Sequence, residues 1–112
     1  MYILIMERDK DFVYLDMFVW DTEKNELNKQ KHGIDFETGV RVFNDPLLYS
    51  EYDYEHSTDE YREKFIGLID GRLMTTLSGT ERDDKIRVIS VRPSTTKEIK
   101  IYENNAKKLQ GN

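Results

Sequence analysis

The chain has 112 residues, 38% of them hydrophobic and 35% charged, which is enough for one modest core and too apolar for a disordered segment. It contains no cysteine, which excludes disulfides and thiolate metal sites and fits a reducing cytoplasm. The apolar opening, residues 1–6, is too short to cross a membrane. We therefore expect a cytoplasmic protein that does not enter a membrane.

The net charge of −5 is unevenly distributed along the chain. Residues 1–60 contain six basic and fifteen acidic residues, whereas residues 61–112 contain eleven basic and seven acidic ones. Phosphate binding depends on local clusters of Lys and Arg rather than on the total charge. The second half can therefore present a basic face, although scatter over a charged surface would explain the same counts.

Residues 1–16 are the least informative part of the chain. Apolar residues follow one another near the start, which allows a strand, but no clear turn or cap follows. We set residues 1–16 apart as a leader of uncertain structure, dispensable for folding, before a single domain of residues 17–112. The apolar run from Met17 to Trp20 predicts the first strand of that domain.

Two helices are predicted after this strand. Asp21 is a good N-cap, and the helix that it opens ends at Gly33, with Leu27 as the residue that clearly packs. Asp35 caps a second helix, which ends before Pro46. Its apolar residues are spaced to form one stripe toward the core: Phe36, Val40 and Phe43.

The second half of the chain predicts strands. Residues 47–54 indicate an edge strand or extended loop, and residues 55–61 a polar loop. Three strand candidates follow, separated by tight turns, and we expect them to form an antiparallel meander. These candidates are residues 65–70, 73–78 and 85–91.

A final helix closes the predicted fold. Ser94 or Thr95 caps residues 96–109, and Ile99 and Tyr102 are spaced to pack on the sheet. The order is one strand, two helices, a meander sheet of about four strands and one C-terminal helix. This order predicts an α+β domain with its helices gathered on one side of the sheet.

Short motifs occur in a defined order along residues 17–103. Trp20-Asp21, Lys31-His32-Gly33 and Phe36-Glu37 are followed by His56-Ser57 and Arg62, and then by Thr80-Glu81-Arg82, Ile86-Arg87 and Ile89-Ser90. The ordered series resembles the BrnT family, ribonuclease toxins of type II toxin–antitoxin pairs. Gly79 and Pro93 depart from the pattern of that family, and the leader lies outside the match.

The resemblance implies a RelE-like fold and RNA cleavage without a metal or cofactor. In that chemistry, basic side chains position a 2′-hydroxyl for attack on the adjacent phosphate. The implied partner is a ribbon-helix-helix antitoxin of the BrnA type, and the complex would reach its operator DNA only through the antitoxin. Two alternatives stay open: a non-enzymatic or weakly active antitoxin-binding subunit, and an unrelated small α+β binding domain.

Arg82, Arg87 and Arg92 are the candidate phosphate-binding and catalytic residues, because the guanidinium offers a planar fork for phosphate oxygens. Strand alternation puts Arg87 on the face opposite Ile86 and Val88 and on the same face as Ile89 and Val91. The alternative is a structural ion pair of Arg87 with Glu81 or Asp84.

Glu81 is a candidate general base, or a residue that orients Arg82 or Arg87; we favour the second role, because nearby arginines would make it a weak base. Arg62, Lys31 and Lys85 are candidate RNA-binding residues, although a loop salt bridge would equally explain Arg62.

The two histidines and the tyrosine-rich segment have simpler interpretations. His32 precedes the helix-ending glycine and is expected to cap or pack, and His56 is expected to be exposed and idle. Neither suggests a metal site. Tyrosines alternate with acidic residues along residues 49–55, an arrangement that repels phosphate and suits a basic protein partner better than RNA.

Overall fold

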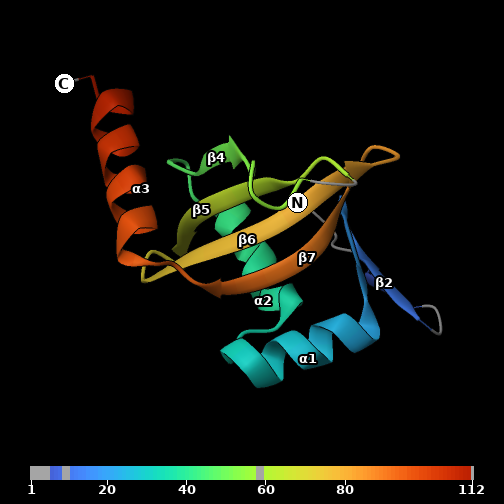
Figure 1. Ribbon diagram of the computed structural model, residues 1–112. Helices are drawn as coiled ribbons and strands as arrows, with labels where there is room; N and C mark the ends of the chain where they lie inside the picture. Colours follow the sequence, from blue (N-terminus) through green and yellow to red (C-terminus); the bar gives the residue numbers. More distant parts are fainter. Residues whose placement is uncertain (1–5, 9–10, 58–59, 112) are drawn as a thin grey trace.

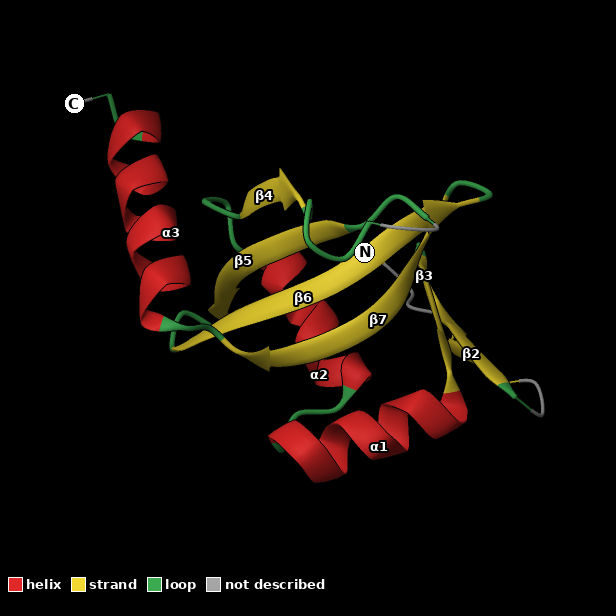
Figure 2. Ribbon diagram, viewed as in Figure 1, coloured by secondary structure: helices red, strands yellow, loops and turns green. Residues whose placement is uncertain are grey.

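The computed structural model describes residues 6–8, 11–57 and 60–111. In these residues the chain forms one seven-stranded sheet with three α-helices and a 3-10 helix (Figures 1 and 2). The strands are β1 (Met6–Arg8), β2 (Phe12–Leu15), β3 (Phe18–Asp21), β4 (Tyr49–Tyr52), β5 (Glu63–Ile69), β6 (Leu73–Arg82) and β7 (Lys85–Pro93). The helices are α1 (Thr22–His32), α2 (Phe36–Gly39), the 3-10 helix η1 (Val40–Asn44) and α3 (Thr96–Leu109).

None of the helices in the described part of the chain is long and apolar enough to span a membrane.

The sheet has the order β1-β2-β3-β7-β6-β5-β4. Strands β4 to β7 form the antiparallel meander that the sequence predicts. The expectation of about four strands is nevertheless wrong, because β3 adds to β7 in parallel and brings β2 and β1 with it. This pairing occupies the edge of β7, which an isolated meander would leave open.

The predicted leader contributes to this sheet. Phe12–Leu15 is β2, which pairs with β3, and Val13 is buried in the hydrophobic core. The short strand Met6–Arg8 extends the sheet further. Residues 1–5, where the apolar run begins, lie outside the described residues. Part of the leader therefore belongs to the folded unit.

Helix α1 has the ends that the sequence predicts and a different buried face. The Asp21 carboxylate accepts hydrogen bonds from two backbone N–H groups of the first turn, and Gly33 ends the helix with a left-handed φ of 77°. The expectation for Leu27 is wrong, because its side chain is exposed. The buried residue is Asn28.

Asn28 is buried because its side-chain amide makes the hydrogen bonds to β7 that a neighbouring strand would otherwise make. Its side chain accepts a hydrogen bond from the N–H of Val91 at 3.1 Å and donates to the Val91 carbonyl at 2.8 Å. It also donates to the Ile34 carbonyl at 2.9 Å. At Val91, β7 has no neighbouring strand on that side, since the pairing with β3 is confined to Ile86 and Arg87. The amide thus satisfies backbone groups that burial would otherwise leave unpaired.

One face of the sheet carries the core. The predicted stripe is confirmed: Phe36 and Val40 are buried, and the Phe43 ring packs between Phe18 and Phe65. The predicted single helix is instead a short α-helix, α2, that continues as η1. Both lie behind the sheet in Figure 2. The buried side chains that they cover include Trp20, Leu77, Val88 and Val91.

Helix α3 starts at the predicted cap, with Thr95 and Glu98 forming a capping box. It stands at one end of the sheet (Figure 1), so the helices are not gathered on one side as predicted. The Tyr102 hydroxyl anchors α3 by donating to Asp45 Oδ2 at 2.6 Å. In the described part of the chain, the second face of the sheet carries no helix over β3 or over the turn between β6 and β7 (Figure 2).

A β-bulge in β7 decides which side chains reach this helix-free face. Ser78 pairs with Ser90, but the next residue, Gly79, pairs with Val88, so Ile89 is one extra residue in β7. An extra residue on one strand reverses the alternation of side chains beyond it.

The bulge overturns one prediction from strand alternation. Val91 is in the core with Val88, and not on the face of Arg87. Arg87 and Arg92 are five residues apart and would point to opposite faces of a regular strand. With the extra residue they lie on the same face of the sheet, Arg87 on its helix-free part and Arg92 at the end next to α3.

Gly79 is required by this close pairing. A Cβ atom at this position would lie 3.1 Å from the carbonyl oxygen of Arg87 and 3.0 Å from a methyl carbon of Ile86. A larger side chain would have to push the two strands apart. The departure from the family pattern at residue 79 therefore has a local structural reason.

Candidate functional site

Three basic side chains gather at the turn between β6 and β7. Asp83 and Asp84 have φ values of 53° and 62°, as a two-residue hairpin turn requires. The turn pairs Arg82 with Lys85 and brings Arg87 opposite Thr80. By strand alternation Arg82, Lys85 and Arg87 lie on the helix-free face of the sheet.

A depression of about 320 Å³ lies beside these residues, and we call it the hairpin groove. Val19 pairs with Arg87 in the sheet, and Tyr14 pairs with Val19, which continues the groove across β3 and β2. Lys85 Nζ donates to the backbone carbonyl of Asp16 at 3.4 Å and so joins the two sides. The residues that line the hairpin groove are Phe12, Tyr14, Val19, Arg82, Asp83, Lys85 and Arg87.

The charges of the hairpin groove are largely unneutralised. Among the described residues Arg87 has no carboxylate within ion-pair distance, and the only ion pair of Arg82 is a 4.0 Å contact with Glu60. Three basic groups face one acidic lining residue, Asp83. Such a surface attracts an anion, and the guanidinium forks match the oxygens of a phosphate.

Glu81 is not part of this groove. It pairs with Ile86, and the alternation of β6 puts it on the face opposite Arg82. There it lines a separate cavity of about 250 Å³ together with Glu63 and Phe65. The structure therefore separates Glu81 from Arg87, and no ion pair of Arg87 with Glu81 or Asp84 is present among the described residues.

Arg92 lies at the other end of β7, in a network around Glu98. The guanidinium donates to both Glu98 carboxylate oxygens, at 2.6 and 2.9 Å. Thr76 Oγ1 donates to the same carboxylate at 3.1 Å, and Lys64 Nζ lies 3.5 Å from it. Burial alone would raise the pKa of Glu98, but the hydrogen bonds from Arg92 and the Thr95 backbone lower it to about 2. The ion pair in turn raises the pKa of Arg92.

The other two candidate RNA-binding residues do not line the groove, although Arg62 shares its ion-pair partner Glu60 with Arg82. Arg62 forms an ion pair with Glu60 at 3.6 Å, its backbone N–H donates to Ser57 Oγ, and its buried Nε has no partner in the described structure. Lys31 is exposed near the end of α1, about 15 Å of helix away from β3. The structure thus brings together Arg82, Lys85 and Arg87 only.

The sequence suggested that His56 is exposed and has no partner; it is exposed, but it pairs with a carboxylate. Its Nδ1 lies 3.0 Å from Oδ2 of Asp53, a buried carboxylate, while more than half of the histidine side chain is exposed. The spacing of an acid three residues before the histidine was the signal that could have indicated this pair. Elsewhere among the described residues, no group of three or more His, Asp or Glu side chains is placed to hold a metal ion.

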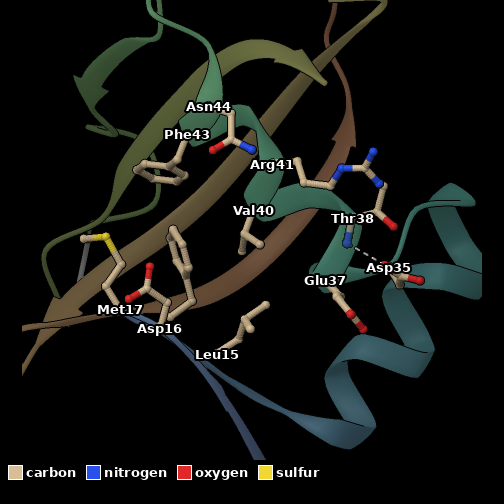
Figure 3. A pocket seen from close by; sticks show the side chains of 11 residues that line it. Leu15, Asp16, Met17, Asp35, Glu37, Thr38, Val40, Arg41, Phe43 and Asn44 are labelled. Atoms are coloured by element: carbon tan, nitrogen blue, oxygen red, sulfur yellow. Dashed lines mark hydrogen bonds between the residues drawn. The ribbon is translucent and has the colours of Figure 1, made fainter. Parts of the chain in front are cut away.

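A second depression, of about 620 Å³, lies on the other side of the sheet, between the turn after β2 and η1. Figure 3 shows the apolar side chains of Leu15, Val40 and Phe43 around it. The carboxylates of Asp16, Asp35 and Glu37 line it as well. Its basic lining residue, Arg41, is neutralised by an ion pair with Asp70. The charge of this depression therefore does not suit a polyanion.

Comparison with known proteins identifies the family of this chain. The model of the ribonuclease toxin BrnT, of type II toxin–antitoxin systems, matches residues 20–98. Among solved structures, the chain is similar to the ribonuclease toxin BrnT of Brucella abortus, with 23% identity, a TM-score of 0.47 and coverage of 69% of this chain and 94% of that one. No curated protein sequence matches it. The family model spans well over half of the chain, which therefore belongs to the BrnT family of ribonuclease toxins.

Proposed function

We propose that this BrnT family member cleaves single-stranded RNA at the hairpin groove without a metal ion. The observation that carries the proposal is the set of three basic side chains, Arg82, Lys85 and Arg87, that face an open groove with little neutralising charge. Arg92 carries the same charge on the same face but is held by a buried carboxylate. The groove is therefore where RNA phosphate gains the most from binding.

The proposed reaction is an attack of a ribose 2′-oxygen on the adjacent phosphorus. The 2′-hydroxyl loses its proton to water, the new P–O bond forms, and the bond to the 5′-oxygen breaks; the 5′-oxygen takes up a proton from water, which leaves a 2′,3′-cyclic phosphate and a 5′-hydroxyl. The crowded intermediate carries extra negative charge on its equatorial oxygens. Arg82 and Arg87 would stabilise that charge through bidentate hydrogen bonds, and Lys85 would hold a neighbouring phosphate.

The test is cleavage of a single-stranded RNA in excess chelator, with the new ends identified chemically. We expect cleavage to persist and the products to carry 2′,3′-cyclic phosphate and 5′-hydroxyl ends. The matched control for the groove variants is Arg72→Ala, an exposed arginine in the turn between β5 and β6. Loss of cleavage in chelator with recovery on adding Mg²⁺ would refute the proposal.

We further propose that the partner is a ribbon-helix-helix antitoxin of the BrnA type, and that operator DNA is bound only through it. The family is one of type II toxin–antitoxin systems, which supports an antitoxin partner. Support for its docking surface comes from β4, which pairs only with β5 in the described sheet, and from a tyrosine cluster at the end of β4 in which the half-buried Tyr52 contacts two exposed tyrosines. The tyrosines of this cluster are Tyr52, Tyr54 and Tyr61.

Acidic side chains around the tyrosine cluster favour a basic segment of the antitoxin as the docking element. Glu51 and Glu55 alternate with the tyrosines along the chain. Aromatic residues with exposed rings are common anchors of protein interfaces. We expect Tyr54→Ala to weaken antitoxin binding in a pull-down of the two purified proteins while RNA cleavage by the free toxin stays unchanged.

A non-enzymatic antitoxin-binding subunit is the second candidate, and the acidic tyrosine surface is the observation that favours it. The two candidates differ in the chelator experiment. RNA that stays intact both in chelator and with added Mg²⁺, with folded, antitoxin-binding protein, would support the second candidate and exclude the first.

A further inference from the structure

Two aromatic residues of β2 line the hairpin groove and lie outside the residues that match the family model. Phe12 and Tyr14 are partly exposed, and both precede residue 20, where the match begins. Their position follows from pairing across three strands, since Tyr14 is opposite Val19 and Val19 is opposite Arg87. The family motifs therefore account for the basic side of the groove and not for its aromatic side.

Contacts among the described residues hold β2, the aromatic side of the groove, next to the basic residues of the hairpin. Val13, between the two aromatic residues, is buried in the core and fixes the orientation of β2. The hydrogen bond from Lys85 Nζ to the Asp16 carbonyl ties the strand after the hairpin to the turn that follows β2. Alternation then directs Phe12 and Tyr14 away from the core, toward Arg82 and Arg87.

We propose that Phe12 and Tyr14 form a stacking subsite for an unpaired RNA base whose phosphates contact Arg82, Lys85 and Arg87. Aromatic faces beside a basic groove are the combination by which proteins bind single-stranded nucleic acids. A base within a duplex stacks on its neighbours and presents no free face to the subsite. The ligand class is therefore single-stranded RNA, and β2 contributes to the binding site from outside the residues that match the family model.

The subsite rests on the proposal that the groove binds RNA, but it does not require cleavage. Phosphate binding and base stacking are separable, because phosphate contacts depend on salt and stacking does not. Changes at Arg87 should lower the salt dependence of binding. Changes at Tyr14 should weaken binding by the same factor at every salt concentration.

The experiment measures binding of a labelled single-stranded RNA by fluorescence anisotropy in chelator, over a range of salt concentrations. We expect Phe12→Ala and Tyr14→Ala each to weaken binding about tenfold and to leave the salt slope unchanged. Tyr14→Phe should bind as the unchanged protein does, because the ring is kept. The matched control is Tyr54→Ala, an exposed tyrosine outside the groove.

A second measurement needs no variant and holds even if Phe12→Ala does not fold. RNA with abasic residues should bind the unchanged protein about tenfold more weakly than the same RNA with its bases. Folded Tyr14→Ala that binds RNA as tightly as the unchanged protein, or equal binding of normal and abasic RNA, would overturn the subsite. Stacking without any cleavage would refute the proposed reaction and leave the subsite standing.

Discussion

Arg87 and Arg92 lie on the same face of the same strand, and their surroundings differ completely. Arg92 donates to both oxygens of the buried Glu98 carboxylate. Arg87 lines an open groove and has no carboxylate within ion-pair distance among the described residues. The difference comes from the element that follows β7, because α3 brings an acid to one end of the strand and none to the other. An arginine is available for a ligand only where no neighbouring element neutralises it.

The end of β7 near α3 is a structural site. Glu98 accepts from Arg92 and the Thr95 backbone and closes the capping box that starts α3. A buried carboxylate needs all of these partners, since an unpaired charge in the interior is strongly destabilising. The groove end has no such constraint: Arg82 is exposed to solvent, and Lys85 and Arg87 are partly exposed.

The largest effect is expected at the structural end. Arg92→Ala should lower the free energy of unfolding by about 3–5 kcal/mol, because it leaves the Glu98 carboxylate buried without its main partner. Urea denaturation measures this, with Arg72→Ala as a control expected to stay within about 0.5 kcal/mol. Full stability of Arg92→Ala together with loss of RNA cleavage would instead make Arg92 part of the RNA site.

Acid should weaken the same end of the molecule. The pKa of Glu98 is lowered from 4.5 to about 2 in the folded state, so its stabilisation is complete above pH 4.5 and is lost as the pH falls to about 2. The loss is on the order of 3 kcal/mol over that range. Melting at each pH should show a steeper acid decline for the unchanged protein than for Glu98→Gln. Parallel curves would contradict the ion-pair assignment.

A shortened chain that starts at Met17 tests how much β2 contributes to the stability of the fold at the groove end of the sheet. It loses the burial of Val13 and the pairing of β2 with β3, so we expect its free energy of unfolding to fall by about 2 kcal/mol. Thermal melting against a chain starting at Asp11 isolates the contribution of β2. Melting near the full-length temperature is what the sequence alone predicted, and it would show that β2 is dispensable for the fold.

The smallest free-energy change is expected at Arg87, where a substitution should lower RNA cleavage without changing the stability of the fold. Arg87→Ala should reduce RNA cleavage about tenfold, or about 1.4 kcal/mol, with an unchanged melting temperature. Arg87→Lys should restore only part of the rate, because a point charge lacks the planar fork. Cleavage and melting are measured on the same preparations as Arg92→Ala. If Arg87→Ala unfolds and Arg92→Ala does not, Arg87 is the structural residue and the assignment of the two ends of β7 is wrong.

Much of the local structure follows from the sequence alone. Asp21, Gly33, Thr95 and the Asp83-Asp84 turn lie where caps and hairpins require them, because these effects depend on a few neighbouring residues. The meander and the stripe toward the core follow from periodicity in the same way. Arg82, Lys85 and Arg87 were candidates from the sequence, because they lie along the best-predicted strand and within the motifs that resemble the family.

The remaining features depend on residues that are far apart in the chain, and only the tertiary structure decided them. Asn28 is buried because it caps the backbone at Val91, 63 positions away, and Glu98 selects Arg92 because α3 turns back across the end of the sheet. The extra residue in β7 moves Arg92 to the face of Arg87, and alternation in the sequence carries no sign of it. Phe12 reaches the hairpin groove through the pairing of β3 with β7. Burial and charge pairing depend on which residues are close in the folded protein, so the pattern along one strand does not predict which groups will meet.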